Sequence, residues 1–253
     1  MKLINGDCMV EMQKIENNSV DLILCDLPYG TTACKWDSVL NLNELWKEYK
    51  RVLKENGVVI LFGQEPFSSI VRTSNLSWYK YDWVWKKNKP SNFQLMNFQP
   101  GRIHENIMIF SEGKACYTKN GNNMLYNPQV EKRDKVRKAN AKIYCREGKE
   151  TAPLLHNYKG NRDNFKEYEY KQPTTILEFS NESKKVHPTQ KPIALLEYLI
   201  RTYSNEGDLI LDNCMGSGST GVACRNTNRD FIGIEKDEHY YQIARERVLS
   251  NES

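Results

Sequence analysis

The stretch Val20-Asp21-Leu22-Ile23-Leu24-Cys25 is largely apolar, and it runs directly into the tetrapeptide Asp26-Leu27-Pro28-Tyr29. A short apolar run that stops at a charged residue is typical of a buried strand. Open α/β sheets bind ligands at the carboxyl ends of their strands. The stretch therefore predicts a ligand-binding sheet edge at which a carboxylate, a carbonyl and an aromatic ring lie together.

These three groups suit the binding of a planar ring that carries an amino group. A carboxylate and a carbonyl both accept hydrogen bonds from NH2, and a tyrosine ring stacks on a heterocycle. We therefore interpret Asp26, Pro28 and Tyr29 as candidate catalytic residues. Tyr29 as a partly buried loop aromatic is the simpler alternative.

A second ligand site is predicted where an apolar strand at 209–212 leads through a glycine-rich turn into a helix. The turn has the spacing G-x-G-x-x-G, formed by Gly216, Gly218 and Gly221. The next strand ends at Glu235, 19 residues after the first of these glycines. This is the pattern of a nucleoside-binding βαβ unit, in which the acid accepts hydrogen bonds from ribose hydroxyls. A tight strand-to-helix turn also needs glycine for structural reasons alone.

Two ligands use such a unit, a dinucleotide such as NAD and S-adenosylmethionine. Asp212, which precedes the glycines, would repel a pyrophosphate but can pair with an ammonium group. An NAD-dependent oxidoreductase that uses residues 209–235 stays open as an alternative, although it gives no role to the tetrapeptide at 26–29.

The remaining pattern alternates strands and helices around one long polar segment. Helices are expected at 42–53, 66–73, 192–200 and 238–249, and strands at 58–63, 79–85 and 107–110. Asn56-Gly57 is expected to end the first helix, and Tyr79, Tyr81, Trp83 and Trp85 are expected to share one face of their strand. Residues 111–186 are polar and are expected to be partly helical and partly loop.

Composition limits the class of protein. The chain has 253 residues, 27% of them charged, and a net charge of +4, which permits nucleic acid as a partner. It has no apolar run of about 18 residues, so no membrane span is expected, and its N-terminus lacks a signal-peptide core. The seven cysteines show no Cys-x-x-Cys pair. They predict free thiols, no metal site and a cytoplasmic location.

Several segments together resemble the amino DNA methyltransferases that use S-adenosylmethionine. Asp26-Leu27-Pro28-Tyr29 is similar to the family's D-P-P-Y catalytic motif, with Leu27 in place of the first proline. The other matching segments are Asn5-Gly6-Asp7, His187-Pro188-Thr189-Gln190-Lys191-Pro192, Leu211 to Thr220, and Ile234-Glu235. The catalytic motif precedes the cofactor motif, and this order is that of the class called beta.

The resemblance implies an α/β, Rossmann-like methyltransferase fold. This is a mostly parallel twisted sheet with helices on both faces and a circularly permuted motif order. Residues 1–110 and 184–253 would form the catalytic and cofactor-binding domain, and 111–183 an inserted target-recognition region. Residues 131–149 of this region hold eight Lys or Arg and three acids. The implied cofactor-binding residues are Asp7, Cys8, Asp26, His187, Thr189, Lys191, Asp212, Gly216, Ser217, Gly218, Ser219, Thr220, Glu235 and Lys236.

Two of these positions keep an alternative, and a third has a specific expected contact. Asp7 either contacts the adenine of the cofactor or is a surface turn residue. His187 either contacts the cofactor or only caps the helix near Pro192. Lys191 is expected to approach the methionine carboxylate.

The resemblance further implies methyl transfer to a base flipped out of double-stranded DNA. In this family an aspartate at the first motif position goes with adenine N6 and a serine with cytosine N4, so Asp26 indicates adenine. Cytosine N4 methylation stays an alternative, as does an inactive DNA-binding protein with this fold. A restriction endonuclease acting separately and a homodimer are both compatible with the resemblance.

Overall fold

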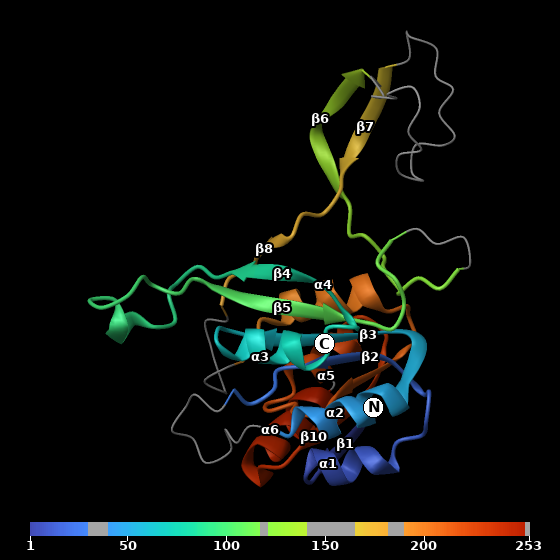
Figure 1. Ribbon diagram of the computed structural model, residues 1–253, viewed down its shortest axis with the longest axis vertical. Helices are drawn as coiled ribbons and strands as arrows, with labels where there is room; N and C mark the ends of the chain where they lie inside the picture. Colours follow the sequence, from blue (N-terminus) through green and yellow to red (C-terminus); the bar gives the residue numbers. More distant parts are fainter. Residues whose placement is uncertain (30–39, 117–120, 141–164, 182–189, 251–253) are drawn as a thin grey trace.

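An eight-stranded sheet forms the centre of the computed structural model, which describes residues 1–29, 40–116, 121–140, 165–181 and 190–250 (Figure 1). The strand order is β1-β10-β9-β2-β3-β5-β4-β8, and only β5 of these eight runs against the others. The predicted Rossmann-like, mostly parallel sheet is confirmed. The strands are β1 (Lys2–Asn5), β2 (Val20–Cys25), β3 (Leu53–Gly63), β4 (Tyr79–Lys86), β5 (His104–Phe110), β8 (Ile176–Glu178), β9 (Leu209–Asp212) and β10 (Asp230–Glu235).

Helices cover both faces of this sheet, and the alternation along β2 shows why. Ile23 and Cys25 pack on one face with α1 (Cys8–Glu11), α2 (Leu42–Val52) and α3 (Phe67–Ser74). Leu22 and Leu24 point to the other face. There they pack with α4 (Ile193–Tyr203), α5 (Ser219–Asn226) and α6 (Glu238–Leu249). A strand buried on both faces reads as a continuous apolar run, as this one does. Two short 3₁₀ turns, η1 (Met12–Lys14) and η2 (Phe93–Leu95), complete the helical elements described.

The prediction that Asn56-Gly57 ends the helix expected at 42–53 is wrong. Helix α2 ends at Val52 and β3 begins at once, with Leu53 paired to Val20. The next paired residue is Val58, so four residues of β3 bulge out opposite Asp21. A Cβ at Gly57 would lie 2.9 Å from the Asp21 carbonyl oxygen. The glycine therefore permits a bulge in a strand, not the end of a helix.

The aromatic residues of β4 do not all share one face. The pairing of β4 with β5 shifts between Tyr79 and Tyr81. As a result, the Tyr79 ring packs against Phe110, at 5.6 Å between centroids, on the α2 side. Trp83 and Trp85 are buried on the opposite side, as core residues. The irregularity in pairing reverses the alternation for one residue only.

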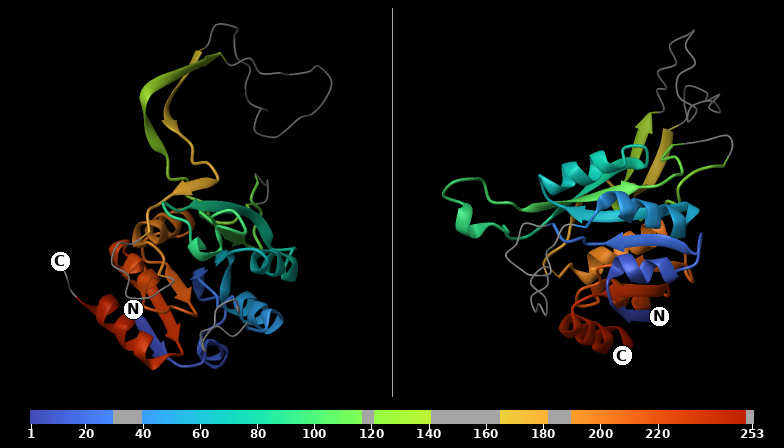
Figure 2. Two further views of the ribbon diagram at one scale, coloured as in Figure 1. Left: turned by 90° about the vertical axis from the view of Figure 1, so that its left-hand side faces the viewer. Right: turned by 60° about the horizontal axis from the view of Figure 1, so that its bottom comes forward.

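The predicted insertion contains strands in its described part, so the expectation of helix and loop is wrong there. Strands β6 (Glu131–Asn140) and β7 (Phe165–Lys171) form a separate antiparallel pair that projects from the body (Figures 1 and 2). Strand β8 instead joins the edge of the main sheet, where Leu177 is buried in the core. The assignment of residues 111–183 as a target-recognition region stays a prediction.

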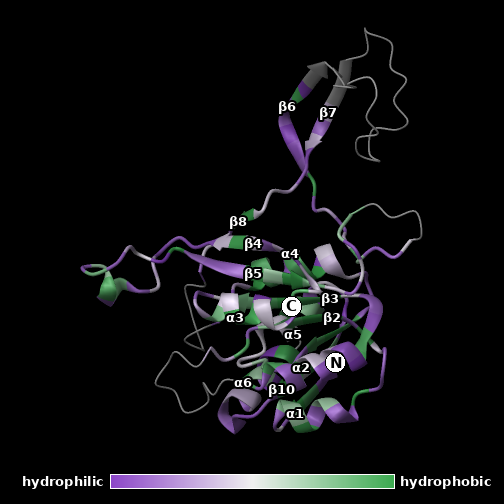
Figure 3. Ribbon diagram, viewed as in Figure 1, coloured by the Kyte–Doolittle hydropathy of each residue, from purple (hydrophilic) through white to green (hydrophobic). Residues whose placement is uncertain are grey.

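The central strands β2 and β3 consist mainly of hydrophobic residues, whereas the coloured part of β6 is mainly hydrophilic (Figure 3). Within the part of the chain that the structure describes, no helix has the length and apolarity needed to cross a bilayer. The five cysteines described, Cys8, Cys25, Cys116, Cys214 and Cys224, are free thiols, as predicted.

Candidate active site

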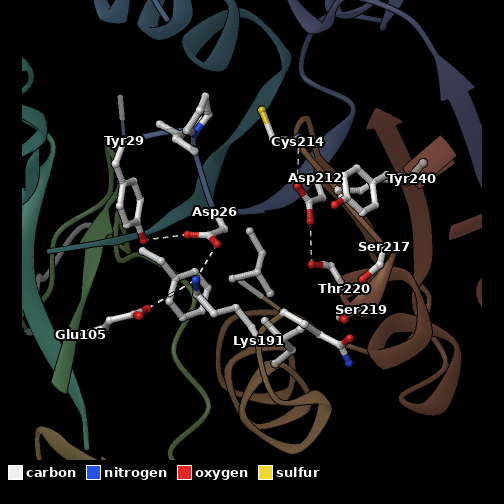
Figure 4. Close-up of a pocket in the computed structure, with 18 of the residues that line it drawn as sticks. Asp26, Tyr29, Glu105, Lys191, Asp212, Cys214, Ser217, Ser219, Thr220 and Tyr240 are labelled. Atoms are coloured by element: carbon white, nitrogen blue, oxygen red, sulfur yellow. Dashed lines mark hydrogen bonds and ion pairs between the residues drawn. The ribbon is translucent and has the colours of Figure 1, made fainter. Parts of the chain in front are cut away.

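One cavity of about 870 Å³ lies at the sheet edge where β1, β10, β9 and β2 end. It brings together the tetrapeptide after β2 and the glycine turn after β9 (Figure 4). The predicted site residues that line it are Asp7, Cys8, Asp26, Pro28, Tyr29, Lys191, Asp212, Gly216, Ser217, Ser219, Thr220, Glu235 and Lys236. His187 and Thr189 lie outside the described residues.

Gly218 is the one described residue of the predicted set that is absent from the cavity lining. Its backbone is left-handed, with φ of +77°, directly before α5. A Cβ here would lie 2.9 Å from the Cβ of Ala244. Glycine at this position therefore allows α6 to pack closely on the turn.

Asp26 is held by two side chains within the cavity. Its Oδ1 accepts a hydrogen bond from the Tyr29 hydroxyl at 2.7 Å, and its Oδ2 lies 2.5 Å from Nζ of Lys191. The Tyr29 ring stacks on Phe67, with 4.8 Å between centroids and 29° between planes. The carboxylate is thus fixed in direction at the end of β2.

Lys191 connects Asp26 to a second carboxylate, Glu105, at the start of β5. Its Nζ lies 3.4 Å from Oε2 of Glu105 and 5.1 Å from the ring centroid of Phe62. The other oxygen of Glu105 accepts hydrogen bonds from Lys87 and, at 3.1 Å, from Gln64. Two cations therefore alternate with two anions, and this pairing is what permits their burial.

The protonation of this network follows from its pairing. Burial lowers the pKa of Lys191, but Asp26 and Glu105 more than offset this and hold it above its usual value. Burial alone would raise the pKa of Glu105. The nearby charges of Lys191 and Lys87 lower this pKa by more, so it lies below its usual value. For Lys87 burial dominates and lowers the pKa. Lys191 is accordingly a cation and Glu105 an anion at neutral pH.

Asp212 and Glu235 shape the turn at the other end of the cavity. Asp212 accepts hydrogen bonds from the Thr220 hydroxyl at 2.6 Å and from the Cys214 amide at 3.1 Å. Burial raises the pKa of Asp212 to about 7. Glu235 accepts from the Gly216 amide at 2.8 Å, and burial also raises its pKa. Both acids therefore order the backbone of the turn.

Asp7 serves as the N-cap of α1. Its Oδ1 accepts a hydrogen bond from the Met9 amide at 3.0 Å, and its Oδ2 pairs with Lys236 at 3.0 Å. The hydrogen bond from Lys236 is the main reason that the pKa of Asp7 is lowered. Asp7 is thus a helix cap whose side chain borders the cavity, and its contact with the adenine of the cofactor stays a prediction.

Sequence reasoning missed the cavity residues that come from the antiparallel part of the sheet. These are Gln64, Lys87, Asn92, Arg102 and Glu105. Because β5 runs against its neighbours, its first residues reach the same edge as the carboxyl ends of the other strands. The acid Glu105 just before the apolar run Ile107–Phe110 was the available signal.

Comparisons with known proteins agree with this geometry. A family model described as DNA methylase matches residues 20–246. Among curated relatives, the type II methyltransferase M.HpaI of Haemophilus parainfluenzae is 30% identical over 98% of this chain and 74% of its own. M.HinfI of Haemophilus influenzae, another type II methyltransferase, is 27% identical over 97% of this chain and 67% of its own.

Solved structures show the same fold. The M1.HpyAVI–SAM complex has a TM-score of 0.61 at 23% identity, covering 97% of this chain and 98% of that one. The cytosine-N4-specific PvuII DNA methyltransferase has a TM-score of 0.65 at 15% identity, covering 99% and 87%. With the family model matching most of its length, the chain belongs to the amino DNA methyltransferases of this DNA methylase family.

Proposed function

We propose that this chain transfers a methyl group from S-adenosylmethionine to adenine N6 of a base flipped out of double-stranded DNA. One observation carries the proposal. The tetrapeptide that suits an amino-bearing ring and the turn that suits a nucleoside line one continuous cavity. Its volume of about 870 Å³ is within the range of ligand pockets.

The cavity suits S-adenosylmethionine better than a dinucleotide. Glu235 accepts a hydrogen bond from the Gly216 amide at 2.8 Å, and Asp212 lies at the same turn. Two acidic side chains there leave few donors for a pyrophosphate but can accept hydrogen bonds from ribose hydroxyls and an ammonium group. We assign the ribose to Glu235, the amino-acid part of the cofactor to Asp212 and Lys191, and the adenine to the side near Asp7. When bound, the cofactor supplies an electrophilic methyl group on a sulfonium.

The tetrapeptide would activate the target amino group. The N6 lone pair of adenine is delocalised into the ring. Hydrogen bonds from N6 to the Asp26 carboxylate and the Pro28 carbonyl favour a tetrahedral nitrogen and free that lone pair. As methyl transfer proceeds, positive charge grows on the nitrogen, and Asp26 stabilises it electrostatically. Alignment of the two ligands in one cavity supplies further acceleration.

DNA contacts are assigned to the projecting strands. On β6, Lys132, Lys135 and Arg137 are exposed. Basic side chains on an element that stands away from the body can neutralise phosphates, which would make DNA binding depend on salt. Base flipping is required because the N6 group cannot be reached inside the duplex.

Two experiments test this function. Sequencing of modified bases in DNA from cells that express the chain should show N6-methyladenine at one short sequence. N4-methylcytosine is the product expected of a cytosine-N4-specific enzyme such as the PvuII methyltransferase. If it were found instead, the acceptor base would be cytosine, and the proposed cofactor and type of reaction would stand. Calorimetric titration should show binding of S-adenosylhomocysteine and none of NAD, and the reverse result would end the methylation proposal.

A further inference from the structure

The connection between β4 and β5, residues 87–103, projects from the body of the protein and carries an apolar tip (Figures 1 and 3). Four large apolar side chains within six residues are exposed at this tip. They are Phe93 at 79%, Leu95 at 45%, Met96 at 46% and Phe98 at 87%. Single exposed apolar side chains are ordinary, but a group of this kind marks an interaction site.

The loop has a defined shape that holds this tip outward. Asn92, which is largely buried, joins its two arms by accepting from the Arg102 amide at 2.5 Å and donating to the Pro100 carbonyl at 3.1 Å. At the tip, the Phe98 amide donates to the Leu95 carbonyl at 2.9 Å. A loop already ordered by its own hydrogen bonds loses less entropy when it binds a partner.

The charges of the loop indicate a polyanionic partner. Residues 86–104 contain no Asp or Glu, and they contain four cationic side chains, Lys86, Lys87, Lys89 and Arg102. Residues 88–99 also contain five side-chain amides, Asn88, Asn92, Gln94, Asn97 and Gln99. Cations and amides are the groups that contact phosphates and base edges in protein–DNA interfaces.

The arms of the loop also border the cavity that is proposed to hold the flipped base. Pro90, Ser91, Asn92 and Arg102, at its two arms, line the same cavity as Asp26. A base that leaves the duplex for this cavity leaves a gap in the stack. Apolar side chains such as phenylalanine and leucine are known to insert between base steps and stabilise distorted DNA.

We propose that the tip of the β4–β5 loop enters the DNA duplex, where the Phe98 ring stacks in the gap left by the target base. This inference rests on the proposed function. Phe93, Leu95 and Met96 surround the ring and cover the adjacent base pairs, while the exposed cations of the arms, Lys86 and Lys89, contact phosphates. The loop thereby stabilises the state in which the base lies in the cavity.

The test compares two duplexes that carry the sequence found by modified-base sequencing. In one the target base is normally paired, and in the other it faces an abasic site, so that flipping breaks no base pair and costs less free energy. Phe98→Ala should lower kcat/KM on the paired duplex by about tenfold to a hundredfold, the range that base stacking supports. On the abasic duplex the loss should be at most about threefold. The double variant Phe93→Ala/Phe98→Ala is included because the Phe93 ring can take the place of a missing Phe98 ring.

Leu76→Ala is the matched control, because Leu76 is 64% exposed and does not line the cavity. It should leave both duplexes unaffected, and all variants should keep the wild-type melting temperature. Equal losses on both duplexes, or no loss in the double variant, would overturn the inference. If the double variant also changes the sedimentation of the free protein, the tip contacts a second copy of the chain instead. Absence of methylation by the wild type would refute the proposed function itself.

Discussion

Removal of the Lys191 charge should destabilise the fold through the two carboxylates that it pairs. Breaking a buried ion pair from one side costs about 3–5 kcal/mol. The lower end applies to Lys191→Met, because Asp26 is 24% exposed and Glu105 keeps its contact with Lys87. We therefore expect the free energy of unfolding to fall by about 3 kcal/mol at neutral pH, measured by urea denaturation with an unchanged m-value.

A double-mutant cycle locates this effect. In Lys191→Met/Glu105→Gln one of the two carboxylates that lose Lys191 is also removed, so the double variant should be more stable than the sum of the single changes predicts, by about 1–3 kcal/mol. The pKa of Glu105 is lowered in the fold, so the stability from its pairing is present above its ordinary pKa and is lost as the pH falls through the folded value. The cost of Lys191→Met should therefore shrink in acid. The proposed role of the ion-pair network would be refuted if the effects of the two single changes on the free energy of unfolding were additive. It would also be refuted if the cost of Lys191→Met did not depend on pH.

Three further outcomes are expected. Asp26→Asn should lower the methylation rate by about a hundredfold or more, because it removes the charge that faces the nitrogen, while binding of S-adenosylhomocysteine by calorimetry stays within about threefold. Gly218→Ala should lower the free energy of unfolding by about 1–3 kcal/mol, because of its positive φ and its contact with α6. The loss should exceed that of Gly216→Ala, where a Cβ meets nothing within 4 Å. Burial raises the pKa of Asp212 to about 7 in the fold. The free energy of unfolding should therefore fall as the pH rises above the ordinary pKa of Asp, by at most about 1.4 kcal/mol per pH unit. Asp212→Asn should abolish this pH dependence, measured by urea denaturation at several pH values.

Local motifs made much of the site predictable. Strand β2 and the residues after it were identified because a buried strand and its polar end lie within ten residues of sequence. The glycine turn and Glu235 were identified in the same way, since one βαβ unit contains them. The resemblance added Asp7 and Lys191, which lie far from these motifs in the sequence.

Features that depend on strand pairing could not be predicted. Nothing in the residues of β5 marks it as antiparallel, so the place of Glu105 in the cavity was missed. The bulge of β3 was misread because Asn56-Gly57 also ends helices. The reversed position of Tyr79 depends on one shift in register with β5. In each case the decisive partner lies on another strand.

The central claim is that one cavity presents a sulfonium methyl group to the amino nitrogen of an adenine. The most direct measurement is mass spectrometry of nucleosides from DNA incubated with the purified protein and S-adenosylmethionine carrying a trideuterated methyl group. The account predicts N6-methyladenine that carries all three deuterium atoms, formed about a hundredfold more slowly, or more slowly still, with Asp26→Asn. Label found only on cytosine N4, or on no base, would contradict it.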